Sequence, residues 1–198
     1  MMENSWELLI NSVKKLHEGN HVLQNFCPFP NDLLVQKVEP FHIEAGNLIK
    51  REKNLNTEKY QDLCDKIIER GQYAHWRQTY KGTAVSSHFL SHFGCYCLIG
   101  VGGPYNSNSM RAWIVYMPSK LYYPWHQHPA EELYFCLAGE ATFKADGKDD
   151  IILCEGGVSE HNSNQPHAMQ TDEKPVLAYV IWRNGFDVLP ELTHDDAK

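Results

Sequence analysis

The segment YYPWHQHPAEELYF, residues 122–135, concentrates side chains that bind metal ions or transfer protons. His126 and His128 are two positions apart, so on a β-strand both imidazoles project from the same face. Glu132 follows His128 by four positions and keeps that parity, whereas Glu131 is expected to face outward. Two imidazoles and a carboxylate on one face of a strand predict part of a metal site.

A third imidazole for such a site has to come from another strand. His167 offers one, because it follows Pro166 in the strand-like segment NQPHAMQT, and His161 is its rival. Three neutral imidazoles and a carboxylate form a mixed nitrogen and oxygen site that suits one divalent transition metal: Zn²⁺, Fe²⁺, Mn²⁺, Ni²⁺ or Co²⁺. The pair His126 and His128 alone would be weak evidence, since two core histidines that form hydrogen bonds can have the same spacing.

A candidate base lies beside these ligands. Tyr134 is two positions after Glu132, so we expect it to share the inward face, although a tyrosine packed in the core has the same pattern. A phenol with an ordinary pKa of about 10 is a poor base at neutral pH, but a nearby divalent cation favours the phenolate. Such a group could abstract a proton α to a carboxylate held on the same metal.

The elements that must hold these residues divide the chain in two. Apolar spacing predicts helices from about residue 6 to Gly19, at 57–70 and at 82–93, with an irregular segment at 25–54. From Gly94 onward the segments CYCLIGV, RAWIVYM, ELYFCLA, EATFKAD, DIILC and VLAYVIWR are short, rich in β-branched and aromatic residues, and separated by turn residues. We therefore expect a mainly β chain, with an α-helical N-terminal extension at 1–93 and an antiparallel β-barrel that carries the metal site at 94–190.

The spacing His126-x-His128-x3-Glu132-x6-Gly139, followed by a histidine on a later strand, resembles the first motif of the cupin superfamily. The resemblance implies a cupin fold, that is, a double-stranded β-helix or jelly-roll barrel with a metal in its interior.

Two positions depart from the cupin pattern. Lys120 stands where a glycine is expected six positions before the first histidine, and Thr171 stands where an asparagine is expected four positions after His167. The second departure keeps His161 open as the third imidazole. We favour His167, because the local pattern around it fits the family better and because His161 is expected to lie in a loop.

A more specific likeness covers residues 70–185. The run MRAWIVYMPSKLYYPWHQHPAEELYFCLAGEATF, with PHAMQT and VLAYVIWR, resembles the cupin-type dimethylsulfoniopropionate (DMSP) lyases, and HWRQTY and FGCYCLIGVGGP are also similar. The resemblance implies elimination of dimethyl sulfide from DMSP, which leaves acrylate. It also implies residue roles: the metal ligands are His126, His128, Glu132 and His167, and the base is Tyr134.

The sulfonium of DMSP is a permanent cation without hydrogen-bond donors, so aromatic faces are its natural binders. The candidate pocket residues are Tyr122, Tyr123, Trp125 and Trp182. In a regular strand Tyr122 would face the same side as His126, but Pro124 can break this alternation. The resemblance favours Tyr123 and Trp182 as pocket aromatics. Packing in the core is the alternative for each of them, and it is our expectation for Trp113.

Composition excludes other classes of protein. The 18 basic and 25 acidic residues give a net charge of −7, which disfavours binding to nucleic acid. The N-terminus lacks the pattern of a signal peptide, and no apolar run approaches the roughly 18 residues that would span a membrane. We therefore expect a cytoplasmic enzyme that acts on a small molecule. Its helical front could cap the barrel or form a homodimer interface.

Three alternatives to a DMSP lyase remain open on the sequence. They are a cupin metalloenzyme with other chemistry, such as a dioxygenase or isomerase, a lyase for another β-substituted carboxylate, and a cupin that only binds its ligand. The role of Tyr134 distinguishes a cupin metalloenzyme with other chemistry from a lyase. A lyase needs this base, whereas an oxygenase should tolerate Tyr134→Phe if its metal is redox-active.

Overall fold

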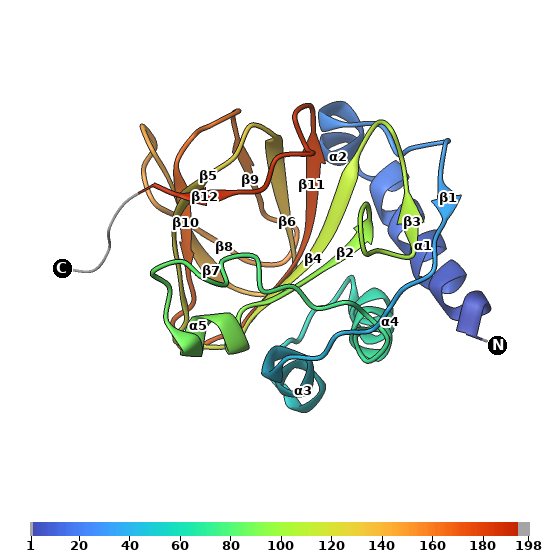
Figure 1. Cartoon of the computed structure of the whole chain (residues 1–198), viewed down its shortest axis with the longest axis horizontal. Helices are drawn as coiled ribbons and strands as arrows, with labels where there is room; N and C mark the ends of the chain where they lie inside the picture. Colours follow the sequence, from blue (N-terminus) through green and yellow to red (C-terminus); the bar gives the residue numbers. More distant parts are fainter. Residues whose placement is uncertain (1, 194–198) are drawn as a thin grey trace.

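The computed structural model describes residues 2–193, which form two facing β-sheets with helices beside them (Figure 1). The strands are β1 (Leu34–Val35), β2 (Gly94–Ile99), β3 (Tyr105–Asn106), β4 (Arg111–Met117), β5 (Tyr122–Gln127), β6 (Glu131–Gly139), β7 (Ala141–Ala145), β8 (Ile151–Leu153), β9 (Val158–His161), β10 (His167–Gln170), β11 (Val176–Arg183) and β12 (Glu191–Leu192). The large sheet has the order β1-β3-β2-β4-β11-β6-β9, and the small sheet has the order β12-β5-β10-β7-β8. This arrangement is the double-stranded β-helix of a cupin barrel, so the expected mainly β fold is confirmed.

The helix predicted from about residue 6 to Gly19 is present and ends at Gly19, whereas the helices predicted at 57–70 and 82–93 are shorter than predicted. The helices are α1 (Met2–Gly19), α2 (His21–Phe26), α3 (Glu44–Arg51), α4 (Gln61–Gly71) and α5 (Ser87–His92). The helix expected at 82–93 begins only at Ser87, because the side chain of Ser86 accepts a hydrogen bond from the backbone N–H of Phe89 and caps the helix there. The segment 25–54, which we expected to be irregular, contains α3 and β1. Within residues 2–193, none of the helices is both long and apolar enough to cross a lipid bilayer.

Two hydrophobic cores lie on the two faces of the large sheet. On its outer face, Tyr96 and Ile114 pack with helical residues such as Leu9 and Ile67, and Figure 1 shows α1, α2 and α4 on this side. On the inner face, alternate strand residues such as Val115 point into the barrel. Because both faces are covered, every residue of β4 is buried, and the strand has no polar side of the usual alternating kind.

Two positions of the cupin-like motif have positive φ angles. Gly139 ends β6 with φ +75°, and a Cβ atom there would lie 1.8 Å from the carbonyl oxygen of Pro175. Lys120 has φ +62°, at the position where the cupin pattern has glycine. The exposed Lys120 therefore adopts the backbone conformation that glycine normally supplies, and the departure from the motif leaves the turn intact.

We expect Gly139→Ala to lower the free energy of unfolding by about 2–4 kcal/mol, because it adds both backbone strain and a clash with the Pro175 carbonyl. Gly147→Ala is the matched control. Gly147 has the same φ of +75°, but nothing lies within 4 Å of its added Cβ. Urea unfolding of the two variants checks this, and an equal loss of stability in both would contradict the importance of the clash.

Candidate metal centre and active site

The expected metal ligands come from both sheets. His126 in β5 lies opposite His167 in β10, and His128 follows directly after β5. Glu132 is the second residue of β6, in the large sheet. All four side chains are buried, each with 2% of its surface exposed. The structure thus brings together the residues whose parity and spacing suggested a common site.

Three imidazoles present the same nitrogen to the interior. The Nδ1–H groups of His126, His128 and His167 donate to the backbone carbonyls of Pro124 (2.8 Å), Ala130 (3.0 Å) and Gln165 (2.8 Å). Since a carbonyl oxygen only accepts, these bonds place the proton of each neutral ring on Nδ1, and each Nε2 keeps a free lone pair. The Nε2 atoms of His128 and His167 are buried without a hydrogen-bond partner. The three rings each offer a nitrogen within 4.8 Å of the others, which fits a metal ion.

Glu132 adds a carboxylate to this cluster. Its Oε2 atom lies 2.9 Å from Nε2 of His167 and 3.5 Å from Nε2 of His128. Its Oε1 atom accepts a hydrogen bond of 2.5 Å from Nε1 of Trp182. Burial alone would raise the pKa of Glu132, but the positive charge that His128 and His167 carry when protonated, together with hydrogen bonds from His128 and His161, outweighs burial and holds that pKa well below its usual range. A cation bound to the same rings would supply that positive charge in place of the protons. The group is therefore an anionic ligand.

His161 lies in β9 and not in a loop, so that expectation was wrong. It sits opposite Glu132 in the large sheet, and its ligand atoms group with those of Glu132 and His167 within 4.8 Å. Both of its nitrogens have partners, however: Nδ1 contacts Oε2 of Glu132 at 3.2 Å, and Nε2 contacts Oγ of Ser159 at 2.9 Å. Burial lowers the pKa of His161 to about 4, which leaves the ring neutral. The hydrogen bonds thus favour His167 as the third imidazole.

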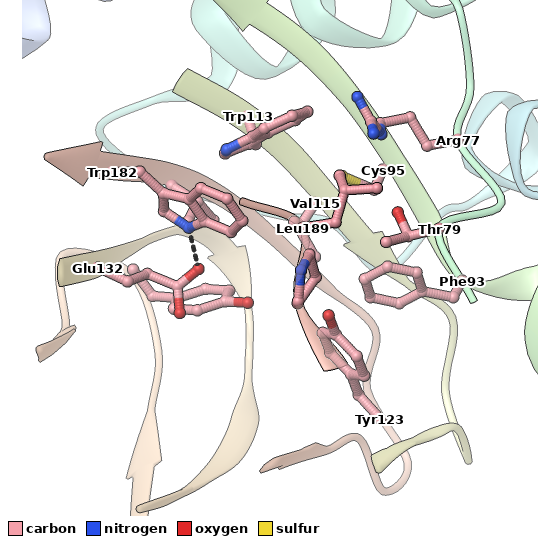
Figure 2. A pocket seen from close by; sticks show the side chains of 13 residues that line it. Arg77, Thr79, Phe93, Cys95, Trp113, Val115, Tyr123, Glu132, Trp182 and Leu189 are labelled. Atoms are coloured by element: carbon pink, nitrogen blue, oxygen red, sulfur yellow. Dashed lines mark hydrogen bonds between the residues drawn. The ribbon is translucent and has the colours of Figure 1, made fainter. Parts of the chain in front are cut away.

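A narrow hollow leads from the surface to Glu132. Five of its thirteen lining residues are aromatic: Phe93, Trp113, Tyr123, Tyr134 and Trp182. Figure 2 shows Trp182 bonded to Glu132 on one side of the hollow and Phe93 on the other. Glu132 therefore belongs both to the imidazole cluster and to the wall of the hollow, so a molecule in the hollow would meet the cluster at Glu132.

Tyr134, the expected base, also lines this hollow and is 4% exposed. Burial and the nearby negative charge of Glu132 raise the pKa of its phenol well above the usual value of 10. Without a cation the hydroxyl is therefore protonated, and a phenolate needs a positive charge close by. This is the electrostatic requirement that the sequence suggested.

The pairing of β5 with β10 is irregular, and this irregularity decides which of the expected aromatic residues of β5 face the barrel interior. Residues 123 and 126 of β5 lie opposite residues 169 and 167 of β10, so β5 contains one extra residue around Pro124. The extra residue puts Tyr123 on the face of His126, where the two rings stack with centroids 4.0 Å apart. Tyr122 instead lines a separate surface hollow with Lys120, so its predicted inward position was wrong. Trp125 is half-buried and is not among the described residues that line the hollow at Glu132.

Sequence reasoning missed several residues of this hollow. Trp113, which we assigned to the core, lines it, and so does Arg77, whose guanidinium lies 4.9 Å from the centre of the Trp113 ring. The four other arginines form ion pairs with carboxylates, whereas Arg77 forms none within residues 2–193. The signals in the sequence were the segments HWRQTY, which contains Arg77, and MRAWIVYM, which contains Trp113; both carried a family likeness but gave neither residue a role in the pocket.

Comparison with known proteins shows the family of this chain. The model of the DMSP lyase family matches residues 41–178. Dimethylsulfoniopropionate lyase DddQ of Ruegeria pomeroyi is 40% identical over 194 residues, which are 98% of this chain and 96% of the relative. A crystal structure of DddQ from this organism has a TM-score of 0.96 and covers 98% of this chain and 99% of that chain. A solved structure of the DMSP lyases RdDddP and RnDddQII has 28% identity and a TM-score of 0.92, over 96% of this chain and 98% of that chain. By the extent of these matches, the chain belongs to the DMSP lyase family.

Proposed function

We propose that this chain cleaves DMSP into dimethyl sulfide and acrylate by β-elimination, with one divalent transition metal held by His126, His128, Glu132 and His167. The observation that carries the proposal is the double position of Glu132, which borders both the imidazole cluster and the aromatic hollow that contains Tyr134. The similarity to DddQ, which is named as a DMSP lyase, supports the choice of substrate.

Proton transfer is the part of the reaction that falls to Tyr134. When bound, the metal would act as a Lewis acid that draws charge from the substrate's carboxylate and acidifies the α-proton. Tyr134, as the phenolate, takes this proton. The electron pair of the Cα–H bond forms the Cα=Cβ double bond while the Cβ–S bond breaks. The pair of that broken bond stays on sulfur, so neutral dimethyl sulfide and acrylate result, and Tyr134 then returns its proton to solvent.

The walls of the hollow suit the other end of the substrate. A sulfonium has no hydrogen-bond donors, so the faces of Phe93, Tyr123 and Trp182 are suitable partners for it. Glu132 and Arg77 supply charges of opposite sign in the same hollow, which suits a zwitterion better than a simple cation.

We expect Phe93→Leu to raise the KM for DMSP about fivefold with little change in kcat, because one cation–π contact is worth about 1 kcal/mol. Phe93 contacts none of the four proposed metal ligands through its ring. Phe89→Leu is the matched control, since Phe89 stacks on Phe93 but is not among the residues that line the hollow. Steady-state kinetics check the prediction, and an equal rise in KM in both variants would point to a general packing effect.

The choice of substrate is tested by the relative kcat/KM of the metal-loaded protein for DMSP and for other β-substituted propionates. We expect DMSP to be preferred strongly over the neutral thioether 3-(methylthio)propionate, which lacks both the cation and the good leaving group. We also expect turnover without O₂, which a dioxygenase would require. A higher kcat/KM for another β-substituted carboxylate would assign the site to a lyase of different specificity.

A further inference from the structure

Ser159 and His161 form a buried chain of hydrogen bonds that ends on the proposed metal ligand Glu132. Ser159 is 6% exposed and His161 is 1% exposed. Because a carboxylate only accepts, the contact of 3.2 Å between Nδ1 of His161 and Oε2 of Glu132 requires the proton on Nδ1. The Nε2 atom of the neutral ring is then the acceptor for the hydroxyl of Ser159, at 2.9 Å. One tautomer of His161 satisfies both contacts.

The same carboxylate is held at its other oxygen by Trp182. Oε1 accepts from the indole N–H of Trp182, while Oε2 accepts from His161 and faces Nε2 of His167 at 2.9 Å. The terminal torsion of a glutamate side chain has a broad energy profile, so a free carboxylate would sample many orientations. Donors on both oxygens fix its plane and turn the remaining lone pairs of Oε2 toward the imidazole cluster.

The hydrogen bonds of His161 differ from those of the three proposed imidazole ligands. Each of those rings donates from Nδ1 to a backbone carbonyl, whereas His161 donates to Glu132 and has Ser159 at its second nitrogen. The His161 ring also stacks on His167, with centroids 4.1 Å apart and planes at 25°, which restrains its rotation. Its position opposite Glu132 in the neighbouring strand β9 sets the contact through the register of the large sheet.

We propose that His161, oriented by Ser159, is a positioning residue that presents the Glu132 carboxylate to the divalent metal. This inference rests on the metal site of the proposed function and assigns His161 a role other than direct ligation. Hydrogen-bond partners of metal ligands typically change metal affinity 10- to 100-fold, so the loss of the His161 donor should be measurable.

The experiment is a titration of the metal-free protein with Co²⁺ against a competing chelator, without any substrate. His161→Phe keeps a planar ring but removes the donor, and we expect it to raise the Kd for Co²⁺ about 10- to 100-fold. His161→Asn places an amide N–H near the position of Nδ1 and should recover most of the affinity. Ser159→Ala, which frees the tautomer, should have a smaller effect in the same direction. An unchanged Kd in His161→Phe, with its fold intact by circular dichroism, would overturn the proposal.

A second measurement separates positioning from ligation. In the Co²⁺-loaded protein, each coordinated histidine with Nδ1 protonated contributes one exchangeable, paramagnetically shifted N–H proton resonance. We expect three such resonances in the unmodified protein and the same three in His161→Asn. Loss of one of them in that variant would identify His161 as a ligand and overturn the positioning role. Both measurements concern the metal alone, so failure to cleave DMSP would leave their result unaffected.

Discussion

Replacing Tyr134 by phenylalanine should lower kcat for dimethyl sulfide release by roughly 10²- to 10⁴-fold, the range typical for the loss of a general base. The substitution removes one buried hydroxyl and keeps the ring that packs against Phe143. Bound metal should stay equimolar with the protein, since Tyr134 is not one of the four proposed ligands. Headspace gas chromatography measures the rate, and metal analysis of the same sample measures the occupancy.

Tyr123→Phe is the matched control for this experiment. Tyr123 is a second buried phenol that lines the hollow, and its hydroxyl bonds to that of Tyr80 at 2.8 Å. We expect that variant to retain most of its kcat, because its hydroxyl has no proposed part in proton transfer. Equal losses in the two variants would show that the hollow is sensitive to any lost hydroxyl, and would remove the special role of Tyr134.

Replacing His167 by alanine is expected to abolish tight metal binding and to lower activity by about 10³-fold or more, since Lewis-acid polarisation contributes several kcal/mol. Among the three proposed imidazole ligands, His167 lies closest to the Glu132 carboxylate. Its loss therefore removes the imidazole that is best placed to share a metal ion with Glu132. A chelator should inactivate the unmodified protein, and added divalent metal should restore it. His42→Ala, at an exposed position, is the control. Full activity in protein stripped of metal would contradict the assigned ligand set.

Much of the site followed from simple periodicities. The alternation of a strand was enough to group His126 with His128 and Glu132 with Tyr134, because the first pair spans the end of β5 and the second lies within β6. A strand-like context also singled out His167, which β10 places opposite His126. Short-range geometry grouped the residues of each strand, whereas the choice of His167 over His161 also rested on the likeness to the cupin family.

The features that the sequence patterns misplaced or missed depend on tertiary structure. The extra residue around Pro124 reverses the parity of β5, so Tyr123 faces inward in place of Tyr122. His161 lies in β9, a four-residue strand of the sequence VSEH that owes its structure to pairing with β6 and carries little strand propensity of its own. Arg77 reaches the hollow because its backbone N–H bonds to the carbonyl of Cys95, a contact that no local pattern encodes.

The most direct test of the central claim is the product yield of purified, metal-loaded protein given DMSP in a sealed vial without O₂. The proposed elimination predicts dimethyl sulfide in the headspace and acrylate in solution in equal amounts, both formed far faster than by Tyr134→Phe with the same metal content. Dimethyl sulfide no higher than that of the Tyr134→Phe variant would contradict the assignment of this site as a DMSP lyase.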